Sequence, residues 1–140
     1  MTALKLLAED DEDLKVISAA LQDAVAVVGD ISYEPAARRL TLLCNRYRWE
    51  KDKRHERVRT ALQIGAVNAV QTRKLRRDAK DAVISLLAVT FEPEDAPSGH
   101  VVLSFAGGGD LRLAVECVDA VLADVTAPWP TPRVPKHDLS

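Results

Sequence analysis

Apolar residues near the start of the chain recur at helical spacing. From Leu14 to Val25 they return every three or four positions, and this spacing predicts an amphipathic helix. A run of acids at positions 9–13 stands just before it. Asp10 or Asp11 is expected to cap the helix, and the other acids favour the positive end of its dipole. We therefore expect a structural role for this acidic run rather than a metal site.

The rest of the chain alternates between apolar and polar positions, as strands with one buried face do. A turn rich in glycine at Gly107–Asp110 separates the last two alternating runs and predicts a hairpin. The run at 82–92 is apolar on both faces and is expected to be the most buried strand. The pattern predicts six or seven antiparallel strands, at 27–33, 40–50, 58–64, 67–72, 82–92, 101–105 and 111–115.

Two features mark the end of the chain. Apolar residues from Val118 to Val125 have helical spacing and predict a C-terminal amphipathic helix. Four prolines then follow Ala127, which excludes regular structure there. We expect one domain over residues 1–126 and a proline-rich tail over residues 127–140.

This order of elements defines the α+β class. So many consecutive strands are expected to curl into an antiparallel barrel or two packed sheets, with the final helix capping an open end. Over residues 27–125 the layout resembles the pleckstrin-homology-type barrel. A likeness of layout does not carry function with it.

Three motifs carry a second resemblance: LKLLAEDDEDLKVISAALQDAV, LCNRYRWE and FAGGGDLRLAVECVDAVLADV. In this order they resemble a family of small, mostly alphaproteobacterial proteins, about 140 residues long, catalogued as a domain of unknown function. The resemblance implies a compact cytosolic bacterial domain. It implies no catalytic residue, because none is assigned in that family.

The chain has a formal net charge of −2, but its charges are unevenly spread. Residues 1–30 hold seven acids and two lysines, whereas residues 46–80 hold twelve Lys and Arg and four acids. A basic face on a mildly acidic molecule is therefore expected. The overall charge and the aromatic content of 4% argue against nucleic acid as the partner.

We find no catalytic or metal-binding motif. Cys44 and Cys117 lie far apart in apolar contexts, which predicts two core thiols in a reducing compartment rather than a disulfide or a nucleophile. Three scattered histidines give no metal-ligand spacing. No cofactor is predicted. We expect a cytoplasmic protein with no membrane insertion, since neither a signal peptide nor a long apolar run is present; the oligomeric state stays open.

The candidate binding residues cluster around the stretch 40–50. Alternation there places Tyr47 and Trp49 on the core face, and it places Arg46 and Arg48 on the opposite face, in solvent. Two arginines two positions apart could together hold a phosphate or carboxylate. Asn45 stands beside them at the exposed end of the strand.

An antiparallel partner strand would bring Arg57 and Arg59 alongside this pair. Such a basic hairpin either binds an anion or is neutralised by nearby acids such as Glu50, Asp52 and Glu56. The leading hypothesis is a non-enzymatic interaction or regulatory domain that binds an acidic protein segment or a small anion. The alternatives are a small enzyme or ligand-handling protein for a phosphorylated or carboxylated metabolite, and a single-stranded nucleic-acid binder.

Overall fold

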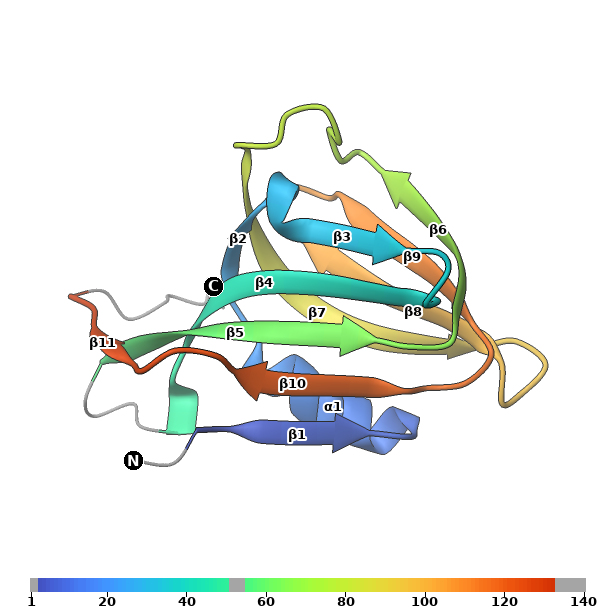
Figure 1. Ribbon diagram of the computed structural model, residues 1–140, viewed down its shortest axis with the longest axis horizontal. Coiled ribbons are helices and arrows are strands. Elements are labelled where there is room, and N and C mark those ends of the chain that lie inside the picture. Colours follow the sequence, from blue (N-terminus) through green and yellow to red (C-terminus); the bar gives the residue numbers. More distant parts are fainter. Residues whose placement is uncertain (1–2, 51–54, 133–140) are drawn as a thin grey trace, which may run out of the picture.

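The computed structural model describes residues 3–50 and 55–132 and consists mainly of antiparallel strands, with one helix packed against β1 and β7 (Figure 1). The helix is α1 (Asp11–Ala20), and a short 3-10 turn, η1, spans Val28–Asp30. The strands are β1 (Lys5–Ala8), β2 (Val25–Val27), β3 (Ile31–Glu34), β4 (Arg39–Tyr47), β5 (Glu56–Ile64), β6 (Val67–Arg73), β7 (Val83–Pro93), β8 (Gly99–Phe105), β9 (Asp110–Val115), β10 (Ala120–Asp124) and β11 (Trp129–Pro130).

The strands form one open antiparallel sheet. The expectation of antiparallel strands is confirmed, and the sheet does not close into the barrel that was one of the two expected architectures. The order of the strands is β1-β10-β5-β4-β2-β7-β8-β9-β6, with β3 attached to β4 and β11 attached to β5. The sheet is strongly curved, as Figure 1 shows, and it stays open between β3 and β6, which are not paired with each other. We call this opening the break in the sheet. Among the described residues β6 pairs with β9 alone and β3 with β4 alone, so each keeps one free edge.

The predicted N-terminal helix is present as α1, but it ends at Ala20, and Val25, expected in the helix, begins strand β2. The Asp10 side chain caps the helix by accepting a hydrogen bond from the Asp13 amide at 2.8 Å, and three acids occupy its first turn. Leu14 and Ile17 are fully buried in the core. The Ser18 hydroxyl accepts a bond from the Val89 amide of β7 at 2.9 Å, which ties the helix to the sheet.

The predicted C-terminal helix is wrong, because residues 120–124 form strand β10. This strand lies between β1 and β5, with Leu122 opposite Leu6 on one side and Leu62 on the other. Its burial alternates, and Val125, which the helix would have buried, is 55% exposed. The pleckstrin-homology-type layout depended on a closing helix and is not confirmed.

The other strand predictions have mixed outcomes. The hairpin of β8 and β9 is confirmed, and Gly107 and Gly108 have the positive φ angles, 93° and 96°, that its turn requires. The prediction that 82–92 is the most buried strand is wrong, since Val83 and Leu87 of β7 are 69% and 48% exposed. The expectation that the tail holds no regular structure is wrong at its start, since Trp129–Pro130 form β11, with Trp129 opposite Arg57 of β5.

No helix among the described residues is long and apolar enough to span a membrane.

Candidate functional site

The inward face of β4 is the opposite of the predicted one. Leu40, Leu42, Cys44 and Arg46 form the buried row, each 1% exposed or less. Tyr47 at the end of the strand is also buried, as expected for the core. The prediction that Arg46 and Arg48 lie in solvent is therefore wrong: their residues are 0% and 3% exposed.

Arg46 can be buried because carboxylates meet its guanidinium group. Its Nε and Nη2 donate to the two oxygens of Asp124, both at 2.9 Å. Its Nη1 and Nη2 donate to Glu50 at 2.9 and 2.7 Å, and Nη1 also reaches the Tyr47 carbonyl at 3.4 Å. These bonds equal the five N–H donors of a guanidinium. Arg46 has no donor left for a ligand.

The same contacts shift the ionisation of the cluster. Burial alone would raise the pKa of Asp124, but the hydrogen bonds and charge of Arg46 outweigh it and lower that pKa. A hydrogen bond from Arg46 likewise lowers the pKa of Glu50. Burial opposes the charge of Arg46, yet the hydrogen bonds that it donates to both acids raise its pKa. All three groups are therefore held in their charged forms.

Arg48 is also paired within the chain. Its Nη1 donates to Glu56 at 2.7 Å, and its Nε lies 3.8 Å from Glu50. Its backbone amide donates to the Glu56 carbonyl at 2.8 Å, which closes the pairing of the two strands. Of the three acids expected to neutralise the hairpin, Glu50 and Glu56 do so, and Asp52 lies outside the described residues.

Arg57 and Arg59 lie on the other face of the hairpin. In the register of β4 and β5, Arg59 is opposite Asn45 and Arg57 is opposite Tyr47, whereas Arg46 is opposite Val58. Arg59 donates to the Asn45 side chain at 3.1 Å and to Asp30 at 2.8 Å.

Arg57 donates to the Asn45 carbonyl at 3.2 Å, and its guanidinium carbon lies 6.0 Å from the centre of the Tyr47 ring. Burial lowers the pKa of Arg57. The structure thus brings the five predicted site residues into one hairpin but divides them between two faces. The expectation of four arginines on one face is wrong.

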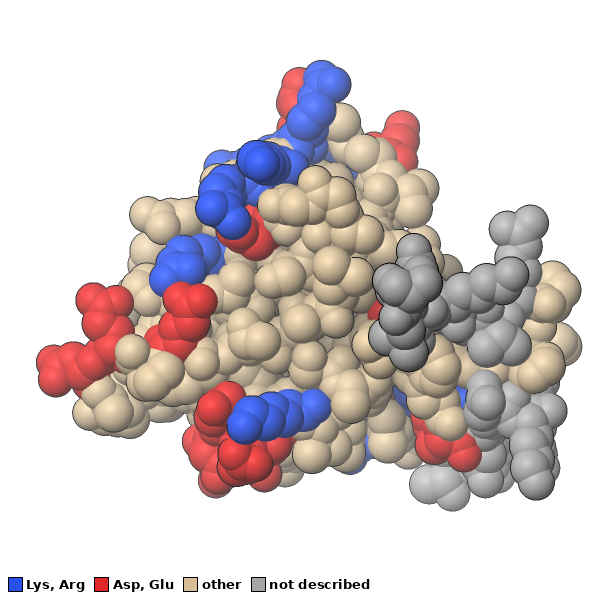
Figure 2. Space-filling model, turned by 180° about the vertical axis from the view of Figure 1, so that it is seen from behind, with Lys and Arg blue, Asp and Glu red and all other residues tan. Residues whose placement is uncertain are grey.

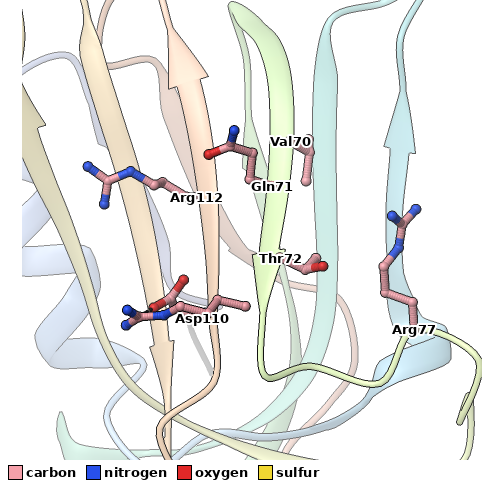
Figure 3. Close-up of a pocket in the computed structure, with 7 residues that line it drawn as sticks. Val70, Gln71, Thr72, Arg77, Asp110 and Arg112 are labelled. Carbon is pink, nitrogen blue, oxygen red and sulfur yellow. Dashed lines mark hydrogen bonds and ion pairs between the residues drawn. The ribbon is translucent and has the colours of Figure 1, made fainter.

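A second group of arginines lies elsewhere and faces solvent. It lines a cavity of about 680 Å³, which we call the basic groove and which Figure 3 shows in close-up. Its walls are residues 70–73 of β6, Asp110 and Arg112 of β9, and Arg77 from the next loop. Because successive strand residues point to opposite faces, a cavity touching all of 70–73 runs over the free edge of β6.

The cations of the basic groove are only partly neutralised. Arg73 pairs with Asp110 at 2.8 Å, and Arg112 pairs with Glu92. The Arg77 side chain forms no ion pair with any residue in the described part of the chain. Arg73 is 72% exposed at its side chain, so its pairing can be exchanged for another anion at little cost.

The loop after β6 adds to this positive field. Residues 73–80 contain five exposed Lys or Arg and a single acid, Asp78. Figure 2 shows Lys and Arg gathered over this loop, at the top of the molecule. Sequence reasoning treated this segment as a charged loop and missed its role in a cavity. The density of basic residues in the loop was the signal that could have indicated the site. Arg112 is distant in the sequence, and only the fold brings it to the groove.

Fold and groove together define a small α+β domain with an open antiparallel sheet and a basic cavity at its break. The chain belongs to the family DUF2948, described as a protein of unknown function, whose pattern matches residues 4–137. No curated protein and no solved structure matches the chain. The predicted resemblance to a domain family of unknown function is therefore confirmed.

Proposed function

We propose that this protein is a non-enzymatic binding domain whose ligand presents a phosphate or carboxylate group to the basic groove. The observation that carries the proposal is that Arg73, Arg77 and Arg112 line one cavity with Asp110 as the acid among its lining residues. Guanidinium groups bind such anions through paired hydrogen bonds. The proposal keeps the expected anionic ligand and moves its site from the β4–β5 hairpin to β6.

The hairpin is the weaker candidate because its buried arginines, Arg46 and Arg48, are already paired with carboxylates. Arg46 already donates all its N–H groups to Asp124, Glu50 and Tyr47. An anion could therefore bind there only by displacing a carboxylate. Arg77 needs no such displacement. An anion entering the basic groove gains charge–charge attraction without breaking a buried pair.

The test is a thermal-shift measurement with pyrophosphate at constant ionic strength, and it compares the wild type with the variants Arg77→Gln and Arg76→Gln. Arg76→Gln is the matched control, because Arg76 belongs to the same loop, is 81% exposed and does not line the groove. We expect pyrophosphate to raise the Tm of the wild type and of Arg76→Gln. Arg77→Gln should bind roughly fivefold more weakly, which corresponds to about 1 kcal/mol.

Equal shifts in all three proteins, or none in the wild type, would contradict the proposal. Two further ligands separate the sources of the anion. A glutamate-rich peptide represents an acidic protein segment, and a single-stranded oligonucleotide represents nucleic acid. Affinity for the oligonucleotide that falls steeply with salt would favour the nucleic-acid alternative.

A further inference from the structure

A second cavity lies beside the basic groove and differs from it in character. It has a volume of about 350 Å³, within the range of small-molecule pockets. Most of the residues that line it are apolar, and three polar side chains, Thr72, Arg77 and Lys80, supply much of its polar surface. We call it the apolar cavity; its apolar lining consists of Val28, Ile31, Tyr33, Leu40, Val70, Leu75 and Leu111.

The break in the sheet creates this cavity. At one end β3 and β6 are joined, since the Tyr33 hydroxyl donates to the Val67 carbonyl at 3.3 Å. Farther along, the loop after β6 passes η1, where the Gly29 amide donates to the Lys80 carbonyl at 2.8 Å. Between these two contacts β3 and β6 are not paired with each other, and residues of β3, β4, β6 and β9 line the cavity.

The two cavities share one wall. Val70, Thr72 and Arg77 line both of them. In Figure 3, Val70 and Thr72 lie on the side of β6 that faces Arg77, whereas Gln71 and Arg112 lie on the other side. Arg77 therefore stands where the apolar cavity meets the basic groove.

This combination limits the chemistry of an occupant. An ion with a full hydration shell gains nothing from apolar walls, and a neutral hydrocarbon makes no use of Arg77 and Lys80. Within the described residues neither side chain has an ion-pair partner. We infer that the ligand is an amphipathic anion, with a hydrocarbon body in the apolar cavity and a carboxylate or phosphate at Arg77. This inference rests on the proposed function, because the same arginine holds the charged group.

Calorimetric titration of the intact chain tests the inference with decanoate, acetate and decanol, the first below its micelle concentration. Decanoate should bind at least about tenfold more tightly than acetate, as burial of about two methylene groups would give. Decanol should bind more weakly than decanoate, because it lacks the charge that Arg77 and Lys80 attract.

Two variants locate the hydrocarbon. Leu75→Gln puts a polar group into the apolar wall, and Ile31→Trp fills the cavity from β3; neither residue lines the basic groove. Both should reduce decanoate affinity by about tenfold and leave the pyrophosphate shift unchanged. Using two sites guards against a folding defect in one.

The outcomes separate the two proposals. Decanoate binding no tighter than acetate, with a normal pyrophosphate shift, overturns the inference and leaves the proposed function standing. Wild-type affinity for decanoate in both folded variants also overturns it. Absence of binding by every anion defeats both.

Discussion

The two arginine groups of this protein differ in what surrounds them. Arg46, at the end of the buried row of β4, donates five hydrogen bonds and is 0% exposed. Arg77, in the loop after β6, is exposed and lines two cavities. A dense arginine motif therefore indicates a binding site only where its N–H donors are not already bonded within the protein. The motif at 46–48 stabilises the fold, and the plainer loop at 73–80 is the candidate site.

The comparison predicts the largest effect at Arg46. Arg46→Met should lower the free energy of unfolding by about 3–5 kcal/mol, because it leaves the Asp124 carboxylate buried without its partner. Urea denaturation measures this change. Arg73→Met is the matched control, since it breaks an exposed pair and should cost less than about 1 kcal/mol. Equal losses in the two variants would break the comparison.

Acid should act on the same cluster. In the folded protein the pKa values of Asp124 and Glu50 lie below their ordinary values of 3.8 and 4.5. Groups with lowered pKa values stabilise the fold above their ordinary pKa values, and this contribution is lost as the pH falls through the folded values. The free energy of unfolding should therefore decline from about pH 5 to pH 3.

Arg46→Met identifies the source of this decline. Without the guanidinium, Asp124 keeps only its hydrogen bonds from the Leu4 amide and Thr60, and Glu50 loses the hydrogen bond that lowers its pKa most. The variant should therefore lose less stability over the same pH range. Denaturation curves collected at several pH values give the two slopes. A variant as acid-sensitive as the wild type would show that other carboxylates are responsible.

The smallest effect on stability is expected in the basic groove. Arg77→Gln should change the free energy of unfolding by less than about 0.5 kcal/mol, because the side chain is exposed and forms no ion pair in the described part of the chain. Urea denaturation alongside the thermal-shift assay tests this. A loss above about 2 kcal/mol would mean that Arg77 is structural, and any change in anion binding would then have another cause.

The pattern of apolar and polar residues predicted the structure correctly where residues close in the sequence determine it. The capped helix α1 and the hairpin of β8 and β9 were predicted for that reason. The same pattern failed at β10, because Val118, just before the strand, and Val121 and Leu122 within it have the spacing of a helix as well as of a strand. Pairing on both sides, with β1 and β5, decides between them, and these partners are distant in the sequence.

The same limit explains the misplaced arginines. An arginine at the end of a strand is expected in solvent, because burying it costs several kcal/mol unless carboxylates surround it. The acid that makes burial favourable, Asp124, is 78 residues away in the sequence. The basic groove was missed for a related reason, since Arg77 and Arg112 line one cavity only after the sheet has folded.

The most direct test is a map of the anion site by amide chemical shifts. Two-dimensional ¹H–¹⁵N spectra of the wild type would be recorded during a pyrophosphate titration. We expect the largest shifts at residues 70–77 and 110–112, around the basic groove. Shifts confined to residues 45–50 and 56–59 would place the anion at the β4–β5 hairpin and contradict this expectation.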